Sequence, residues 1–566
     1  MKRRHCMGVL NLLLTALATG DLYAAAAAAA APPDFKPSAG AWVGRSGAVA
    51  NQDRSWERFH CDGKPGAMQL VHVTSANNGA TWSEPRTLRD LPGEGWGGEA
   101  ALPALDGEMH LFVTRRRQVG EGKVPGVNVM YDIWHFKSSD KRTKWPDPKP
   151  VFEGYVGAMS NALRLASGRI VVPFGMLIGG RPAAPPNGRH ELTCIYSDDD
   201  GKTWTMSPAR LTSPVPENYN GSGEGACEPT IVQLKDGRVW MLMRTAAGFL
   251  YESWSDDGSK WSDTKPSRFH ASHGPPYLIR LKDDRIALFW NNCELPPRFE
   301  GAGVYGGRDA LHAAIGDAEA KHFVGFREIY LDPKRNDSPP RSGDRGTAYP
   351  DALLASDGRI GVASGQGGRA ALMLVDPAWL YETSRASDFS DGIANWSVYK
   401  GFGKAAGWWR DRVQGAQLVD HPDQNGKKVL HVRRPDEKDP DGATWNFPMG
   451  RSGSLVTRIM AKEGGRGGNI TLSERFFDPS DATCDAKALF LLPLSDLKPG
   501  AWHEVALKWD VAARKCVVAI DGKESTSLTM AHDTPTGVAY VRFRSTASEV
   551  DPAGFLIESV RVDVKP

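Results

Sequence analysis

Two charged side chains mark the ends of neighbouring apolar runs, where they could do chemistry together. Glu228 precedes the apolar residues 229–234, and Arg244 ends the run at 239–243. The Asp-Gly turn between the runs predicts a hairpin, which brings both ends to the same edge. A charged side chain at the end of a buried run needs a partner or a ligand. The pair is therefore either a structural ion pair or part of a binding site.

Two more candidates follow later in the chain. Arg308 comes directly after two glycines, which allow the backbone to approach a neighbour closely. Tyr349 opens the inner strand expected in the last hairpin, around residues 357–358. Each has an ordinary alternative, since Arg308 could be a surface arginine and Tyr349 a buried core residue.

A recurring turn motif predicts the elements that position these residues. Residues 197–204 fit Ser-x-Asp-x-Gly-x-Thr-Trp, and residues 75–82 change only the Asp to Asn. Decayed copies lie at 138–145, 255–261 and 316–323, so the terminal aromatic residues recur at spacings of 63, 59, 57 and 62. Asp, Asn and Gly favour hairpin turns, and the aromatic ring is expected to be buried between neighbouring units.

A second motif alternates with the first and completes the repeat. It is an apolar run, a polar turn and another apolar run, at residues 102–113, 161–174, 229–243, 277–290 and 352–363. Together the motifs give about four strands per repeat, the unit of a β-propeller blade. The last hairpin lacks a turn motif, and we expect N-terminal strands to complete it. The sequence therefore predicts an all-β fold whose residues 32–383 form a six-bladed β-propeller.

The N-terminus is typical of a processing signal. Residues 2–4 are basic, residues 9–17 are largely apolar, and residues 24–31 are small. We interpret residues 1–31 as a signal peptide and expect a periplasmic or secreted protein. The apolar part is too short to span a bilayer, and we expect no membrane span elsewhere.

The residues after the propeller predict a second domain, residues 386–566. Residues 499–510 alternate apolar and polar side chains and are followed by an apolar run that ends in Asp-Gly at 521–522. This pattern resembles the late strands of concanavalin-like or laminin-G-like jelly rolls, which are β-sandwiches. Its tryptophans Trp408, Trp409 and Trp445 are either sugar platforms or core residues, and core packing is the stronger interpretation.

The charge and the cysteine and histidine content limit the classes of ligand that we expect the protein to bind. The net charge is +2 and no Lys/Arg-rich tract is present, so we expect no nucleic acid partner. No His or Cys spacing suits a metal, and we expect no metal or other cofactor. After export, two interpretations of the cysteines stay open: a disulfide between Cys484 and Cys516, or buried free thiols.

The order of these motifs resembles a known family. Over approximately residues 40–380, the chain is similar to sialidases (exo-α-neuraminidases) with Asp-box repeats. The similarity lies in the repeated turns, in the Glu-Pro-x-x-Val-x-Leu-x-Asp-Gly-Arg segment ending in Arg244, in a later Gly-Arg, and in Ala-Tyr before Asp-Gly-Arg-Ile-Gly. The resemblance implies a nucleophilic tyrosine, a glutamate as its base, an aspartate as general acid/base and three arginines around the substrate carboxylate. Carried onto this chain, these are Tyr349, Glu228, Asp62, Arg244, Arg308 and Arg45.

The chain departs from the family at its start. Sialidases usually open with Arg-Ile-Pro, which supplies the first arginine, and no such tripeptide is present. Arg45, Arg54 and Arg58 are the nearby arginines, and Arg45 is taken as the candidate.

The leading hypothesis is an exported sialidase-like exo-glycosidase. It would release a terminal, acidic sugar from a glycan with retention of configuration. Another propeller enzyme acting on polysaccharide, such as a rhamnosidase or an exo-acting lyase, is the first alternative. A glycan-binding protein without catalytic activity is the second.

Overall fold

β-Strands make up nearly all the regular structure of the chain. The computed structural model describes residues 34–36, 47–51, 53, 55–64, 66–93, 95–124, 126–178, 189–214, 224–294, 307–331, 347–366, 369–400 and 413–566. The predicted signal peptide, Arg45, Trp408 and Trp409 lie outside these residues. Among the described residues, no helix has the length and apolar character to cross a membrane. The described part of the chain contains two short 3₁₀ helices, η1 (Pro377–Tyr381) and η2 (Ala482–Lys487).

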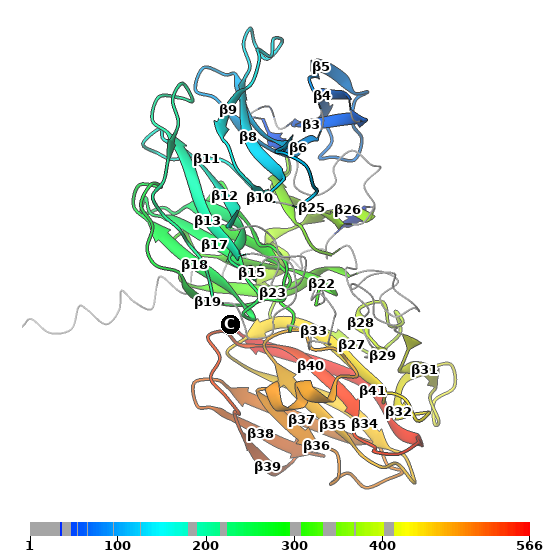
Figure 1. Cartoon of the computed structure of the whole chain (residues 1–566). Coiled ribbons are helices and arrows are strands. Elements are labelled where there is room, and N and C mark those ends of the chain that lie inside the picture. The colour runs from blue at the N-terminus through cyan, green and yellow to red at the C-terminus, as the bar shows by residue number, and fades with distance from the viewer. Residues whose placement is uncertain are drawn as a thin grey trace, which may run out of the picture.

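Five sheets follow one another along the first part of the chain, each with a path of four strands in sequence order (Figure 1). The first contains β2 (Gly47–Ala50), β3 (Trp56–Lys64), β4 (Ala67–Ser75) and β5 (Arg86–Leu91). The second contains β6 (Trp96–Pro103), β7 (Met109–Gln118), β8 (Val129–Lys137) and β9 (Lys149–Phe152). The third contains β10 (Val156–Met159), β12 (Ile170–Ile178), β13 (Arg189–Ser197) and β14 (Thr205–Met206), with β11 (Leu163–Arg164) and β15 (Glu224–Gly225) at its side.

The fourth and fifth sheets repeat this plan. The fourth contains β16 (Cys227–Gln233), β17 (Val239–Arg244), β18 (Phe249–Ser255) and β19 (Lys265–His270). The fifth contains β20 (Tyr277–Arg280), β21 (Ile286–Trp290), β22 (Ala310–Gly316) and β23 (Phe323–Leu331). The five predicted hairpins are confirmed, because the inner two strands of each pair antiparallel, including those of the last sheet.

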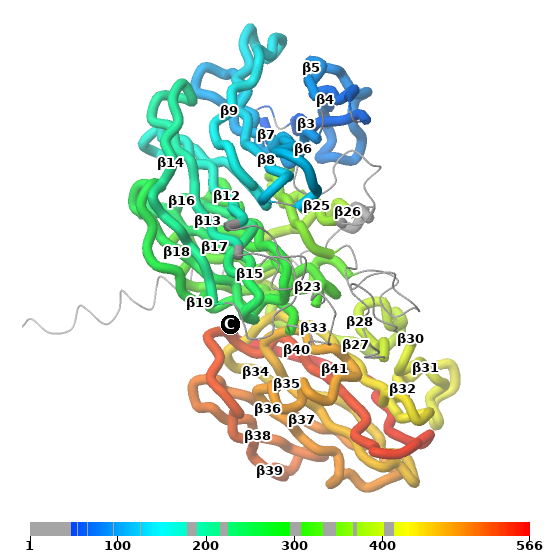
Figure 2. The backbone as a smooth tube through the Cα atoms, in the orientation of Figure 1, coloured from blue at the N-terminus to red at the C-terminus, as the bar shows by residue number. Residues whose placement is uncertain are grey.

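A sixth sheet joins the two ends of this region. It runs β1 (Asp34–Lys36), β26 (Arg369–Val375), β25 (Ile360–Gln366) and β24 (Asp351–Leu354). The expected completion of the last hairpin by an N-terminal strand is thus confirmed, with β1 antiparallel to β26. The first strands of successive sheets contact one another in the order β2, β6, β10, β16, β20, β24 and back to β2. This all-β arrangement is consistent with a β-propeller, and Figure 2 shows this part of the chain above the C-terminal part.

The turn motif forms the same hydrogen bonds in different sheets. In residues 197–204, the Gly201 N–H donates to Ser197 Oγ (2.8 Å), and the Thr203 N–H donates to Asp199 Oδ1 (2.9 Å). Residues 75–82 repeat both bonds through Ser75 and Asn77, so Asn replaces Asp without loss of the turn. The following ring packs on the preceding sheet, as Trp204 does edge-on to Phe112.

Trp56 of the first sheet joins it to the sixth. Its ring is fully buried in a cluster with Leu353, Leu372 and other residues of the sixth sheet. The indole N–H donates to the carbonyl of Leu354 across 3.0 Å. A Cβ on Gly361 would overlap this ring, so a glycine is needed for the sheets to approach.

Gly361→Ala is therefore expected to lower the free energy of unfolding by about 1–3 kcal/mol, because the added methyl group displaces the Trp56 ring. Urea unfolding followed by tryptophan fluorescence measures this change. Gly97→Ala is the control, since its Cβ would meet open space. Equal stability of the two variants would contradict the close packing at Trp56.

The C-terminal part consists of two larger antiparallel sheets. One contains β31 (Gln417–Asp420), β32 (Lys428–Arg434), β41 (Asp551–Lys565), β34 (Ser452–Ala461), β37 (His503–Asp510), β38 (Lys515–Ile520) and β39 (Lys523–Thr529), with β27 (Ser384–Ser387) paired to β41. The other contains β28 (Trp396–Ser397), β33 (Gly442–Gly450), β40 (Val538–Ser545), β35 (Gly468–Ser473) and β36 (Phe490–Pro493). A small sheet pairs β29 (Tyr399–Lys400) with β30 (Val413–Gln414).

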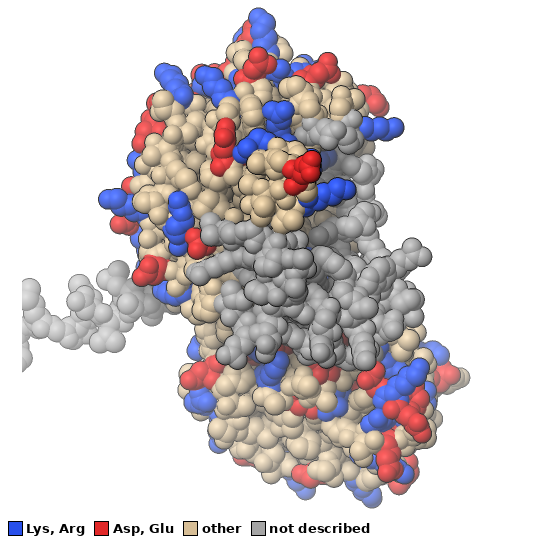
Figure 3. Space-filling view, in the orientation of Figure 1, with Lys and Arg blue, Asp and Glu red and all other residues tan. Residues whose placement is uncertain are grey.

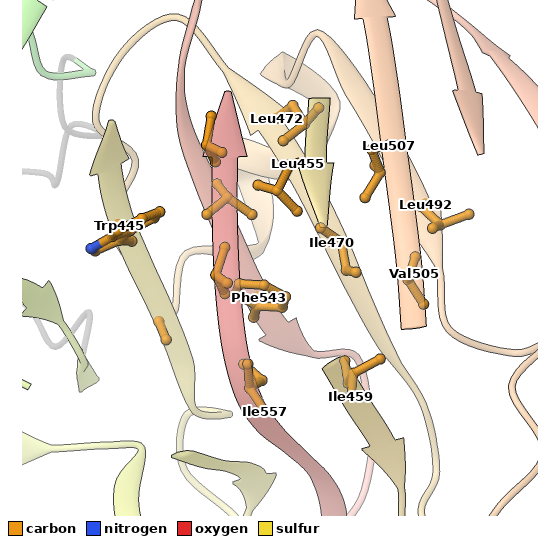
Figure 4. Packing of buried hydrophobic residues seen from close by; sticks show 14 of the residues in the cluster. Trp445, Leu455, Ile459, Ile470, Leu472, Leu492, Val505, Leu507, Phe543 and Ile557 are labelled. Carbon is orange, nitrogen blue, oxygen red and sulfur yellow. The ribbon is translucent and has the colours of Figure 1, made fainter. Parts of the chain in front are cut away.

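Apolar side chains from both sheets form one core, which makes this part a β-sandwich (Figure 4). Trp445 lies in that core, 1% exposed and stacked on Trp396, so it is a packing residue and offers no surface platform. The proposed Cys484–Cys516 disulfide is wrong, because both are buried free thiols. Cys516 belongs to the main core, whereas Cys484 lies in a separate cluster with Phe477. On the face shown in Figure 3, basic and acidic side chains are interspersed over the described surface.

The sandwich is fastened to the fifth sheet by a directed chain of hydrogen bonds. The Asn292 N–H donates to His312 Nδ1 across 3.1 Å, so His312 Nε2 must carry the proton toward the Tyr540 hydroxyl. Tyr540 in turn donates to Glu328 Oε1 across 2.8 Å. His312 and Tyr540 are both fully buried. Burial lowers the pKa of His312 from 6.5 to about 3, which keeps the ring neutral.

This depressed pKa predicts how stability depends on pH. In the unfolded chain His312 takes up a proton below about pH 6.5, whereas in the folded chain it does so only near pH 3, so the stability falls as the pH drops from 6.5 toward 3. His312→Gln removes one titrating group and should make the fall of the urea midpoint over this range shallower. An equally steep fall in the variant would show that His312 titrates normally in the folded protein.

Candidate active site

Glu228 occupies an interruption in the pairing of β16 with β17. Cys227 pairs with Arg244 and Pro229 pairs with Met243, which leaves Glu228 as an extra residue, a β-bulge. Its φ of 53° lies in the left-handed region, which is rare for a residue with a side chain. A bulge re-aims a side chain, so Glu228 is directed away from the ordinary alternation of the strand.

The same end of two other inner strands is also irregular. The pairing of β10 shifts around Gly157, and the pairing of β6 shifts between Gly97 and Ala100, around Gly98 with φ 65°. Tyr349, two residues before the start of β24, has φ 58°. Left-handed backbone at a non-glycine residue costs about 1–3 kcal/mol, and such residues gather at functional sites. Glu228 and Tyr349 thus share an unusual conformation in two distant sheets.

Arg244 brings these two residues together. Its Nη1 donates to Glu228 Oε2 at 2.6 Å and to the Tyr349 hydroxyl oxygen at 3.2 Å. Its Nη2 lies 2.9 Å from His273 Nδ1, and because a guanidinium only donates, this nitrogen of His273 accepts. Burial disfavours the guanidinium charge, but the charge of Glu228 and its other neighbours outweighs burial and raises the pKa of Arg244. Arg244 is therefore a permanent cation in contact with a carboxylate and a phenol.

Arg308 contacts Tyr349 at its ring, whereas Arg244 contacts the hydroxyl. The guanidinium carbon of Arg308 is 5.2 Å from the centre of the Tyr349 ring. Its Nε and Nη2 both donate to the His273 carbonyl oxygen, at 3.1 and 2.8 Å. His273 consequently contacts both arginines, Arg244 with its ring and Arg308 with its main chain. This histidine was not among the site residues predicted from the sequence.

A pocket of about 520 Å³ opens beside Glu228 and Tyr349. Glycines of two bulged strands face it, and two aromatic rings stand edge-on in its wall with centroids 5.5 Å apart. Its lining includes Gly98, Thr114, Tyr131, Tyr155 and Gly157. The pocket has the size of a small-ligand site.

The remaining candidates have different positions. Asp62 lies on β3, is exposed, and accepts a hydrogen bond from the Gly63 N–H at 2.8 Å. It is near enough to Arg58 and His60 to influence their pKa values. Arg45 lies outside the described residues. The four residues Glu228, Arg244, Arg308 and Tyr349 are therefore brought together, and Asp62 lies on a strand of the first sheet.

Sequence reasoning missed a cluster around Arg58. Burial lowers the pKa of Arg58, against the charges of Glu99, Asp351 and Asp62. Burial also raises the pKa of Glu99, whose Oε1 accepts the Cys61 N–H at 2.7 Å. A signal for Glu99 existed, since it follows two glycines as Arg308 does. Among the described residues, no group of His, Cys, Asp and Glu could hold a metal ion.

Comparison with known families identifies part of the chain. Residues 91–362 match the model of the BNR repeat-like domain. This BNR repeat-like region contains Glu228, Arg244, Arg308 and Tyr349. No curated protein sequence matches the chain.

Solved structures resemble the chain at a distance. A protein of unknown function from Dyadobacter fermentans is 18% identical with a TM-score of 0.42, over 60% of this chain and 94% of that one. Trypanosoma rangeli sialidase is 12% identical with a TM-score of 0.41, over 94% and 92% of the two chains. A mutant of NanB sialidase from Streptococcus pneumoniae is 14% identical with a TM-score of 0.40, over 61% and 68%. Likeness at this level does not argue for an activity.

Replacing Glu228 tests the charge balance of the site. Glu228→Gln removes a carboxylate from Arg244, whose side chain is only 4% exposed, and should lower the free energy of unfolding by about 3 kcal/mol. Asp236→Asn is the control, because it breaks an exposed pair with Arg238 at the other end of the same hairpin and should cost less than about 1 kcal/mol. Urea unfolding compares them, and equal costs would show that Arg244 does not depend on Glu228.

Proposed function

We propose that the protein is an exported, sialidase-like exo-glycoside hydrolase that releases a terminal acidic sugar from glycans. The observation that carries this proposal is the contact of one buried guanidinium with both Glu228 and Tyr349 at the edge of a pocket. The proposed scaffold is a closed six-bladed β-propeller over residues 32–383, with a concanavalin-like sandwich over residues 386–566. Residues 1–31, with their basic, apolar and small-residue segments, are the proposed export signal.

The proposed nucleophile is Tyr349 and its base is Glu228. An acidic sugar with a carboxylate at its anomeric carbon would repel a carboxylate nucleophile, whereas a neutral phenol approaches without that repulsion. Free tyrosine has a pKa of about 10, so a base must remove its proton as the bond forms. Both oxygens accept from the same Arg244 nitrogen, which places the carboxylate beside the phenol and a positive charge beside the developing phenolate.

The reaction would proceed in two displacements. The Tyr349 oxygen forms a bond to the anomeric carbon, its proton passes to Glu228, and the glycosidic oxygen leaves with a proton from Asp62. Water then attacks the same carbon, gives a proton to Asp62, and releases Tyr349, which recovers its proton from Glu228. Two inversions leave the configuration unchanged, as in other retaining glycosidases.

The carboxylate of the sugar would lie against the arginines. Arg244 and Arg308 flank Tyr349, and a planar guanidinium matches a carboxylate better than a lysine does. A third arginine would come from Arg45 or from Arg58, whose acidic neighbours Glu99 and Asp351 hold a cation in this region. Comparing Arg45→Met with Arg58→Met would assign the position, since only the true ligand should raise KM strongly.

Tyr349→Phe tests the proposed function directly. The variant keeps the ring beside Arg308 but has no nucleophilic oxygen, so release of the fluorophore from a sialic acid or related acidic glycoside should fall by a factor of about 10³ or more. Binding of the free sugar should persist. Full activity in the variant would remove Tyr349 as nucleophile. An increase in absorbance from an unsaturated uronate, with acidic polysaccharide as substrate, would instead identify a lyase.

A further inference from the structure

Asn291 connects three of the site-bearing segments. It follows β21 and is fully buried. Its Nδ2 donates to the carbonyl oxygens of Ala310, at 2.6 Å, and Thr347, at 3.0 Å. Ala310 is two residues after Arg308 in the chain, and Thr347 is two residues before Tyr349. One amide group therefore fixes the spacing of two segments that carry candidate site residues.

The same side chain also reaches the third segment. A Cβ on Gly274 would collide with Asn291 Oδ1, so the amide lies directly against the residue that follows His273. The main chain adds a bond, because the Ser272 N–H donates to the Asn291 carbonyl at 3.3 Å. Thr347 closes the arrangement with a 2.6 Å hydrogen bond from its Oγ1 to the Arg308 carbonyl. Asn291 thus touches the chain beside His273, Arg308 and Tyr349 alike.

The next residues after Asn291 are held by the C-terminal sandwich. Asn292 Nδ2 donates to the Glu474 carbonyl at 2.9 Å, and the Phe476 N–H donates to the Asn292 carbonyl at 2.9 Å. The Glu294 N–H donates to the Phe476 carbonyl at 2.8 Å. The Glu294 carboxylate pairs with Arg475 at 2.6 Å. A strand-like segment of the second domain, residues 474–476, therefore runs beside residues 292–294.

We propose that Asn291 is a positioning residue of the active site and that the C-terminal sandwich holds it in place through Asn292. The sandwich is then part of the catalytic unit. Its residues 474–476 hold residues 292–294 in place, and Asn291 beside them sets the distances between the segments that carry Arg308, Tyr349 and His273. This inference rests on the proposed function for its activity readout. Its structural readout, hydrogen exchange, is independent of that function.

Two substitutions test the proposal. Asn291→Asp keeps the shape of the side chain but removes both of its N–H donors, so that a carboxylate oxygen faces the carbonyl oxygens of Ala310 and Thr347. We expect kcat to fall by about a hundredfold, with a smaller change in KM. Asn292→Ala leaves Asn291 intact and breaks only the side-chain bond to the sandwich, and kcat should fall by about tenfold. In both variants, amide exchange in residues 308–311 and 347–351 should become faster.

Asn469→Ala is the matched control. Asn469 is a buried asparagine of β35 whose Nδ2 donates to Asp485 at 2.9 Å within the sandwich. It should lower stability while leaving kcat and exchange at 347–351 unchanged. If Asn291→Asp does not fold, Asn292→Ala decides alone. Unchanged kcat and exchange in Asn292→Ala would overturn the proposal.

The outcomes separate this inference from the proposed function. If the unaltered protein cleaves none of the acidic glycosides, the proposed function fails, while faster exchange at 308–311 and 347–351 in Asn292→Ala still supports the positioning role. If the unaltered protein is active and neither kcat nor exchange changes in the variant, the positioning role fails alone.

Discussion

The candidate site depends on one buried cation. Arg244 lies at the end of an apolar strand, where the charge of Glu228 and its other neighbours outweighs the cost of burial. A buried ion pair contributes little net stability compared with an apolar pair of the same shape, since both charges lose their hydration. What the pair supplies is orientation, because one guanidinium bonds the Glu228 carboxylate, the Tyr349 hydroxyl and the His273 ring at once.

Local patterns predicted the elements because the turns and the strands are local in sequence. Asp-Gly and Asn-Gly pairs mark the hairpins, and the alternation in residues 503–510 marks β37. The apolar run after it forms β38, which turns at Asp521 and Gly522 into β39. The completion of the last sheet by β1 was predicted because each repeat has about four strands and the last hairpin lacked some of them. Burial of Trp445 agrees with the core interpretation, because it lies on β33, a strand whose residues are all buried.

The site was predicted less completely, because it is assembled from residues far apart in the chain. Glu228, Arg244, Arg308 and Tyr349 each lie at or within two residues of the end of a strand, and that position was visible in the sequence. The environment of Arg58 was not, since Glu99 and Asp351 come from other sheets. The role of His273 was also hidden, because its contact with Arg308 is made by its main-chain carbonyl, and the residue type does not reveal such a contact. The bulge at Glu228 has no sequence signature, as the residue there is not a glycine.

The bulges have a consequence for how such a pocket can change. An extra residue in a strand is not part of the ladder of hydrogen bonds, so its side chain can be exchanged while the neighbouring pairs keep their register. In β16 this place holds Glu228, in β10 it holds Gly157, and in β6 it holds Gly98 together with Glu99. Each bulge is thus a position at which a side chain can change without altering the surrounding sheet. New recognition groups can be introduced at these positions one at a time.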